Sequence, residues 1–384
     1  MKKIKTKSDL KDTFYTLAPI NWILTFFALN CVRRKNGKLV VHWSLLRNLS
    51  SIVTIFIVIT CFLYGKVSNI EKNEDGSIKF INLIEMTFLL DYVQYIIDLY
   101  YVFKTKHVLI KYYENYDHID KITGMTYYKS IRTSIAYTFI INIVIILFPI
   151  ILDYLTYSVM FGWLRPTLFS IDYFFNMLNT LTIVNLTAHV IQMTYRLKRI
   201  ESIFKHSYTP LEASNNIFLN NWDVLYIKKC YLMLLEQTEY VNYIYGFRMV
   251  LFSLLEIIWM VSEINIAIRV TSGSLRPDYP PAYFPGFVSL LRLCSFSSIL
   301  FSLVHRCEQT YKKNKNIVNI LDFIIMNECL NAELKSSLVE LRDLVFFRPI
   351  VFHASDYFTI NKKLLVSVCS VVVTYSIIFF QNMD

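Results

Sequence analysis

The sequence predicts an all-α membrane protein with seven transmembrane helices. The chain has 384 residues, of which 55% are hydrophobic and 18% charged, and its mean hydropathy is +0.41. Soluble domains carry about 45–50% apolar and about 25% charged residues. The apolar excess is concentrated in long continuous runs, which indicates membrane helices and not the alternating pattern of a membrane β-barrel.

Seven apolar runs qualify as spans, although the first is short and is expected to begin earlier, near Trp43. The predicted spans are Ser50–Tyr64, Ile78–Phe103, Ser134–Leu155, Thr167–Tyr195, Tyr243–Ile268, Phe284–Val304 and Leu364–Phe380. No small-residue cleavage site follows the basic start of the chain, so we expect no signal peptide. The shorter apolar stretch Ala18–Leu29 is predicted to be a helix at the inner membrane surface.

The distribution of Lys and Arg predicts the orientation. The segments before the first span and after the second, fourth and sixth together carry 31 of these residues, whereas the alternate segments carry 6. Positive residues stay in the cytoplasm. The N-terminus is therefore expected inside and the C-terminus outside, which is the reverse of a G-protein-coupled receptor. The third and seventh spans also lack the Asp-Arg-Tyr and Asn-Pro-x-x-Tyr motifs of those receptors.

Sequence motifs of catalysis are missing. The seven His are scattered, and there is no His-x-x-x-His, Cys-x-x-Cys, Gly-rich phosphate loop or Gly-x-Ser-x-Gly. We therefore expect no enzyme, no metal and no cofactor. The net charge of +10 follows from the basic inner segments and does not predict nucleic-acid binding. No Cys lies in a predicted outer loop, so no disulfide is expected.

Charged and polar residues within the spans are the candidate ligand-binding residues, because they are costly in a membrane and usually face a cavity or one another. Glu256 and Glu263 lie seven residues apart on the fifth span, so they share a face, and Trp259 lies between them. The candidate set is Glu85, Asp91, Asp172, Asn176, Glu256, Trp259, Glu263 and Arg292.

Depth in the membrane predicts two ion pairs, one between two candidate residues and one between two residues outside the candidate set. Asp98 of the second span and Arg248 of the fifth lie in the inner half, and Arg292 lies at middle depth, where it could neutralise Glu256. An acidic and aromatic surplus then remains on the outer side, which suits a small-molecule pocket. The alternative is that these groups only bond to one another.

The segment between the sixth and seventh spans contains an amphipathic helix. In "NAELKSSLVELRDLV", Leu334, Leu338, Leu341 and Val345 recur at spacings of 4, 3 and 4, and Asn331 suits the N-cap. We interpret it as a cytoplasmic anchor that packs on other helix ends or on a neighbouring subunit. The predicted organisation is a cytoplasmic N-terminal segment (1–49), a six-helix ligand-binding bundle (50–305), the anchor (306–363) and a pore-lining seventh helix with a short outer tail (364–384).

The end of the chain resembles the insect gustatory receptor family. That family carries a Thr-Tyr, five hydrophobic residues and a Gln in its seventh helix, which correspond here to Thr374, Tyr375, Ser376–Phe380 and Gln381. The preceding "FHASDYFTINKKLL" is similar to the family's approach to that helix. The motif covers about thirty residues. Size, seven spans and inverted topology extend the resemblance to the whole chain, with Ser376 as a mild departure.

The resemblance implies a multi-pass plasma-membrane receptor that is a ligand-gated, non-selective cation channel, formed as a homo- or heterotetramer with other gustatory receptor subunits. The seventh helices would line one pore, with Thr374, Ile378, Gln381 and Asn382 facing it. The implied ligand is a plant-derived or bitter-type tastant. The first alternative is a receptor channel for a sugar or polyol, and the second is a metabotropic seven-helix receptor. Contacts with membrane lipid are expected.

One departure concerns the gate. The family often places a bulky hydrophobic residue directly after the Gln, whereas this chain has Asn382. A ring of amides dewets poorly compared with a hydrophobic constriction. Either the gate moves to Ile378, or the closed pore is held differently, or this subunit works beside others.

Overall fold

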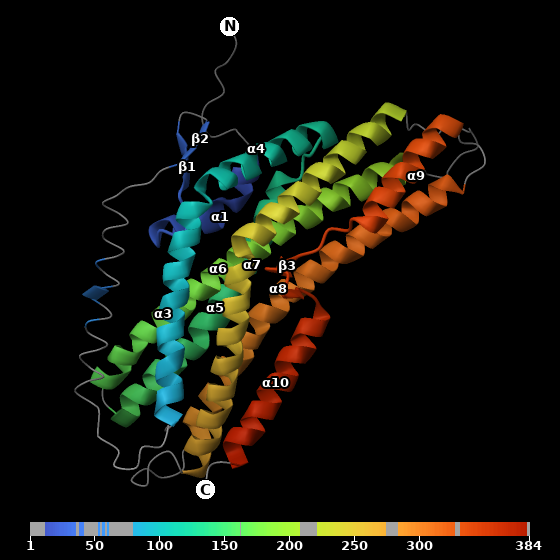
Figure 1. Cartoon of the computed structure of the whole chain (residues 1–384). Helices are drawn as coiled ribbons and strands as arrows, with labels where there is room; N and C mark the ends of the chain where they lie inside the picture. Colours follow the sequence, from blue (N-terminus) through green and yellow to red (C-terminus); the bar gives the residue numbers. More distant parts are fainter. Residues whose placement is uncertain are drawn as a thin grey trace.

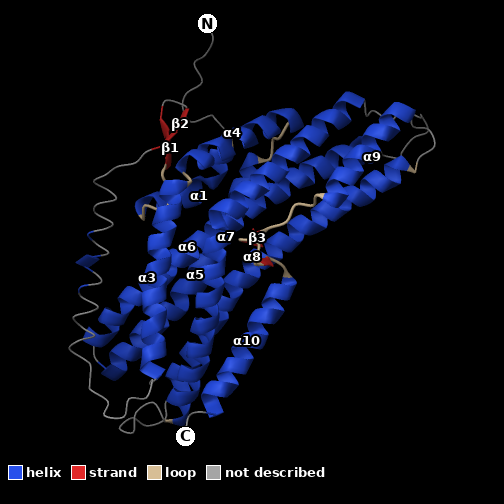
Figure 2. Cartoon of the chain, viewed as in Figure 1, coloured by secondary structure: helices blue, strands red, loops and turns tan. Residues whose placement is uncertain are grey.

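A computed structural model of the chain describes residues 12–35, 38–41, 80–161, 163–207, 221–273, 283–326 and 331–381. The described part is almost entirely helical (Figure 2). The first predicted span, Ser50–Tyr64, lies outside the described residues except for Val53, Phe56, Ile57 and Thr60, which are helical.

The remaining predicted spans are confirmed as helices. They coincide with α3 (Phe80–Lys104), α5 (Tyr128–Phe161), α6 (Leu164–Ser207), α7 (Asn221–Ser272), α8 (Tyr283–Ile325) and α10 (Lys362–Gln381). Within the described residues, α5, α6, α7 and α8 are each long and apolar enough to cross a membrane. The helix α5 exposes a continuous apolar face that lipid would cover, formed by Tyr137, Ile140, Val144, Phe148 and Ile151.

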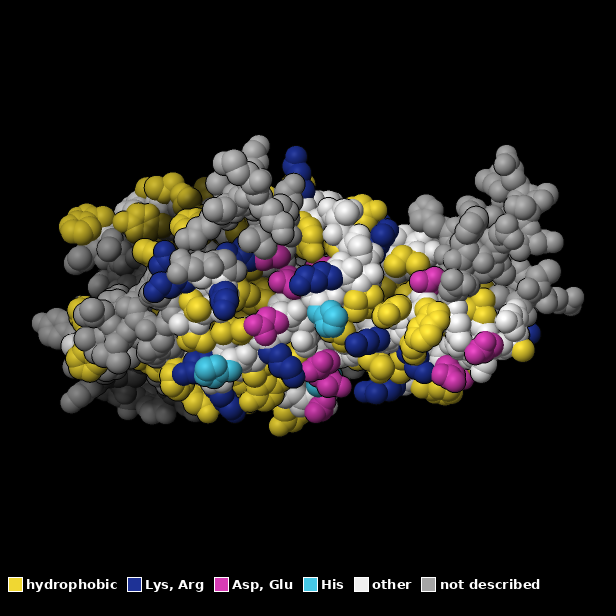
Figure 3. Space-filling view, turned by 90° about the horizontal axis from the view of Figure 1, so that it is seen from above, with side chains coloured by type: hydrophobic (Ala, Val, Ile, Leu, Met, Phe, Trp, Pro, Cys, Tyr) yellow, Lys and Arg dark blue, Asp and Glu magenta, His cyan; other side chains and the backbone are white. Residues whose placement is uncertain are grey.

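Three of these helices extend far beyond their apolar runs at one end of the molecule. There the end of α6, the start of α7 and the end of α8 lie together with α9 (Ala332–Phe347), as Figure 1 shows. Seen from that end, the surface carries charged side chains of both signs among hydrophobic ones (Figure 3). The orientation of this end toward the cytoplasm stays a prediction.

The predicted amphipathic helix is confirmed as α9. Its N-cap Asn331 accepts a hydrogen bond from the backbone N of Glu333, at 3.4 Å. Leu338, Leu341 and Val345 are buried, and α9 packs on α8 and α7. Such an apolar stripe is stable only when another surface buries it. Helix α9 therefore docks on the extended ends of α7 and α8.

The structure contains elements that the sequence analysis did not predict. Helix α4 (Lys106–Thr123) follows α3 and ends at Gly124, whose φ of 60° lies in the left-handed region that glycine adopts without a steric penalty. Strands β1 (Val32–Lys35) and β2 (Lys38–Val41) form an antiparallel hairpin near the N-terminus.

The predicted surface helix at the N-terminus is α1 (Thr13–Phe26), which begins five residues before the expected start at Ala18. Asp12 caps it by accepting a hydrogen bond from the backbone N of Tyr15, at 2.9 Å. One face is buried against the bundle, whereas Trp22 and Phe26 are each 66% exposed.

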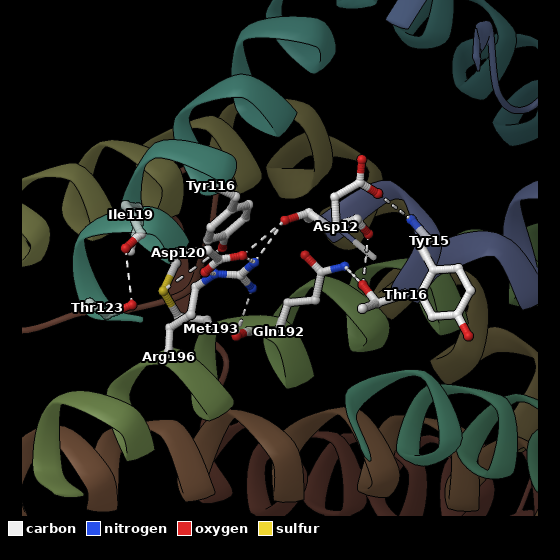
Figure 4. A network of polar contacts seen from close by, with 11 residues as sticks. Asp12, Tyr15, Thr16, Tyr116, Ile119, Asp120, Thr123, Gln192, Met193 and Arg196 are labelled. Carbon is white, nitrogen blue, oxygen red and sulfur yellow. Dashed lines mark hydrogen bonds and ion pairs between the residues drawn. The ribbon is translucent and has the colours of Figure 1, made fainter. Parts of the chain in front are cut away.

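A buried polar network holds α1 against α4 and α6 (Figure 4). The guanidinium of Arg196 forms two hydrogen bonds to the carboxylate of Asp120, at 2.9 and 2.8 Å, and a third to the hydroxyl of Thr13, at 2.8 Å. Beside it, the amide of Gln192 donates to the hydroxyl of Thr16 at 2.9 Å. Separating α4 from α6 would leave a buried charge without its partner, and separating α1 would break the hydrogen bond from Arg196 to Thr13.

A short hairpin joins α9 to α10. Its strands are β3 (His353–Ala354) and β4 (Phe358–Thr359), which pair antiparallel with His353 opposite Thr359. Helix α10 begins directly after this hairpin and packs along α7 and α8 (Figure 1).

Candidate functional site

The terminal helix α10 covers only one of its faces with the rest of the chain. Val368, Val372 and Ser376, spaced by four residues, are buried against the bundle. Thr374, Ile378 and Gln381 are all exposed, and the side chain of Ile378 is 43% exposed. The predicted pore stripe is therefore uncovered within a single subunit. Asn382 lies outside the described residues.

A first cluster of predicted ligand-binding residues meets in the middle of the bundle. Asp91 of α3 accepts a hydrogen bond from Nε1 of Trp259 on α7, at 3.0 Å, and another from Nδ2 of Asn179 on α6, at 2.8 Å. All three side chains are at least 95% buried. The indole ring of Trp259 also lies 5.9 Å from the ring of Phe296, measured between centroids. Three helices therefore converge on one carboxylate.

This cluster holds more acidic groups than it has counter-charges. Glu256 lies one turn before Trp259 on α7 and is 3% exposed, and its Oε2 makes no hydrogen bond within the described structure. Among the described residues, no basic side chain pairs with Asp91 or Glu256. Both amide atoms of Gln94, one turn from Asp91, are likewise buried without a hydrogen bond. Buried polar groups usually have partners, so unpaired groups here indicate a place for a further donor or cation.

A second cluster lies further along α7 and corrects one predicted pairing. Arg292 of α8 pairs with Glu263 at 2.7 Å and with Asp153 of α5 at 2.7 Å, and not with Glu256. The hydroxyl of Tyr173 hydrogen-bonds to both Arg292 and Asp153. The guanidinium thus neutralises carboxylates from two helices, and Glu263 is removed from the acidic surplus that the sequence predicted.

The predicted Asp98–Arg248 pair is confirmed. Nε of Arg248 lies 2.5 Å from Oδ1 of Asp98, and the hydroxyl of Thr182 donates to Oδ2 of Asp98 at 2.5 Å. Both charged side chains are at most 5% exposed. The pair ties α3, α6 and α7 together on the side of the first cluster that is nearer α4.

The other predicted site residues join neither cluster through a described contact. Asn176 is buried on α6, and the side chains of Glu85 and Asp172 lie outside the described part of the structure. The sequence analysis missed Asp153 as a partner of Arg292, although the residue lies near the end of the third predicted span. A search for every carboxylate at a span end would have found it.

The fold and these buried clusters define a polytopic helical membrane protein. One face of its last helix, which includes the polar residues Thr374 and Gln381, is exposed within the single subunit. A family model described as 7tm chemosensory receptor matches residues 17–382. The chain therefore belongs to the 7tm chemosensory receptor family, which confirms the sequence resemblance at that level. Members of this family are receptors and not enzymes, and the chain is a multi-pass protein of the plasma membrane.

Solved structures agree with this assignment. The chain is similar to the insect olfactory receptor OR5 from Machilis hrabei, with a TM-score of 0.65 and 12% sequence identity over 95% of this chain and 99% of that one. It is also similar to the same receptor in complex with eugenol, with a TM-score of 0.62 and 12% identity over 95% and 97% of the two chains. At this identity the likeness shows the fold alone. None of the curated proteins is significantly similar in sequence.

Proposed function

We propose that this chain is a gustatory-type receptor subunit that acts as a ligand-gated, non-selective cation channel. The observation that carries the proposal is the uncovered stripe of Thr374, Ile378 and Gln381 on α10, whose opposite face packs on the bundle. Four subunits arranged around one axis would bury this stripe along a water-filled pore. Gln381 would then form a ring of amides at the pore mouth, where a polar side chain has access to water and ions.

The proposed ligand is a small tastant that reaches the cluster of Asp91, Glu256 and Trp259. Two buried carboxyl groups without a basic partner favour a ligand that brings a positive charge, and the adjacent aromatic rings would add cation–π attraction. A bitter-type plant amine has this chemistry. The related OR5 has been solved in complex with eugenol, also a small molecule, which supports a ligand of similar size.

The channel is tested by expressing the chain alone and together with other receptor subunits from the sensory cell that produces it. We expect a ligand-evoked cation current that persists when G-protein signalling is blocked. A current that disappears under that block would contradict the channel and favour a metabotropic seven-helix receptor. An epitope tag after Asp384 distinguishes the same two classes. We expect antibody to reach the tag from outside intact cells, whereas the C-terminus of a G-protein-coupled receptor has the opposite orientation.

The ligand class is tested with a panel of bitter amines, uncharged bitter compounds and sugars on a responding receptor. We expect Asp91→Asn to weaken the response to amines, since it removes a carboxylate without changing the shape of the side chain. Asp322→Asn, at a partly exposed ion pair with Arg342 near the end of α8, is the matched control. A response to sugars that Asp91→Asn reduces, without any response to amines, would favour the polyol alternative, since carboxylates also accept sugar hydroxyls.

A further inference from the structure

The hairpin that leads into α10 is bound to α7 and α8 by hydrogen bonds from two side chains, Asn242 and Tyr311. The amide of Asn242 on α7 donates to the carbonyl of Val351 at 3.0 Å and accepts from the backbone N of His353 at 3.2 Å. The hydroxyl of Tyr311 on α8 donates to the carbonyl of Ile360 at 3.1 Å and accepts from the backbone N of Phe352 at 3.1 Å. Both ends of the hairpin are therefore held.

A glycine allows the turn of the hairpin to rest directly on α7. Gly246 lies one turn after Asn242, and a Cβ atom placed on it would be 2.7 Å from the backbone N of Ser355 and 3.3 Å from its Cα. The hairpin turn is tight, because Ser355 and Asp356 have φ values of 47° and 63°, in the left-handed region. Any larger residue in place of Gly246 would push the backbone of the hairpin away from the helix.

We propose that hairpin 353–359 is the joint through which α7 sets the position of α10, and that Gly246 is the positioning residue on which it rests. This inference depends on the proposed channel function. The same helix α7 carries Trp259 of the candidate ligand cluster and Gly246 beneath the hairpin, and α10 starts three residues after the end of β4. A displacement of α7 along or about its axis therefore reaches the start of α10 through a backbone contact, without a flexible side chain between them.

The test uses the full-length receptor and two independent measurements. The first is the rate of tryptic cleavage at Lys362 and Lys363, which are exposed and are the first two residues of α10. The second is the current, recorded as the ligand-free level, the half-maximal ligand concentration and the reversal potential. For Gly246→Ala we expect cleavage to rise about tenfold, the factor for about 1.4 kcal/mol of lost contact. We also expect the ligand-free level or the half-maximal concentration to change by a similar factor, with the reversal potential unchanged.

A second variant separates this effect from misfolding. Tyr311→Phe keeps the ring and removes the hydroxyl that binds the hairpin, so we expect a smaller change in the same direction in both measurements. Tyr240→Phe is the matched control, because it removes the hydroxyl that donates to Glu236 on the same helix and makes no described contact with the hairpin. It should behave as the wild type at the hairpin.

Two results would overturn the inference. Wild-type cleavage and gating in both Gly246→Ala and Tyr311→Phe would show that the hairpin does not depend on these contacts. Faster cleavage with unchanged gating, in a receptor whose wild type gives a ligand-evoked current, would show that the hairpin does not couple α7 to α10. If the wild type gave no current at all, the channel function itself would fail, and the cleavage rates would still decide whether Gly246 supports the hairpin.

Discussion

Replacing Arg248 by Leu should destabilise the receptor strongly, because it leaves a buried carboxylate without its counter-charge. The side chains of Arg248 and Asp98 are 5% and 0% exposed, and their closest atoms are 2.5 Å apart. Removing one partner of such a pair costs about 3–5 kcal/mol. At about 2 °C per kcal/mol for a large chain, the melting midpoint should fall by about 6–10 °C.

The double variant Asp98→Asn/Arg248→Leu identifies the cause. It removes the charge of Asp98, and the new amide can still accept the hydrogen bond from Thr182. We therefore expect the double variant to melt above Arg248→Leu, which a double-mutant cycle in purified receptor measures at a fixed scan rate. Arg342→Leu, at an ion pair whose side chains are 30% and 37% exposed, should lower the midpoint by less than about 2 °C. Losses in the two single variants that simply add in the double would refute the buried-charge explanation.

The remaining predictions concern the ligand cluster, the pore and pH. Trp259→Ala should raise the half-maximal ligand concentration about tenfold for each 1.4 kcal/mol of lost contact and leave the reversal potential unchanged, as dose–response recordings would measure. Gln381→Ala should change ion selectivity, conductance or resting leak without changing which compounds activate. If Gln381→Ala changed which compounds activate and Trp259→Ala changed ion selectivity, the assignment of pocket and pore would be reversed. Burial in α4, with the nearby charges of Asp12 and Asp120, raises the pKa of Asp117 from 3.8 to about 6. Ionising Asp117 therefore opposes folding, so the stability that its protonated form contributes should be complete below pH 3.8 and lost as the pH rises through about 6. Asp117→Asn should remove that part of the pH dependence of the melting midpoint, and an unchanged profile would contradict it.

The transmembrane helices and α9 could be predicted from sequence because their signals are local. Length and continuous hydropathy identify a span, and Leu338, Leu341 and Val345 repeat at the helical period. Helix α4 has no long apolar run, although its buried residues Tyr112, Tyr113, Tyr116 and Ile119 also recur at the helical period. A scan for apolar runs does not detect a helix whose buried face is aromatic and whose other face is charged.

Pairings between helices were predictable only where depth left one choice. Asp98 and Arg248 are the opposite charges in one half of the bundle, and they pair as predicted. Depth matched Arg292 to Glu256, but its long side chain reaches Glu263, two turns further along α7, and Asp153 of α5. The importance of Gly246 was not visible in the sequence, since it arises from the approach of Ser355, more than a hundred residues later in the chain.

In the proposed channel, the distribution of polar contacts along α7 indicates which of its interfaces can move during gating. Toward α3 and α8, this helix is held by buried pairs at Arg248, Trp259 and Glu263, and shifting any of them would separate charges or hydrogen bonds in an apolar surrounding. Toward α10 the packing uses the small side chains of Val368 and Val372, which can slide without losing a charge pair. A ligand acts only through its different affinity for two states. Two states that keep the same buried ion pairs avoid the cost of separating charges in an apolar surrounding, so they interconvert most easily. In the proposed channel we therefore expect the bundle to move as a unit and α10 to pivot about the hairpin at Gly246, where α7 and the start of α10 stay joined.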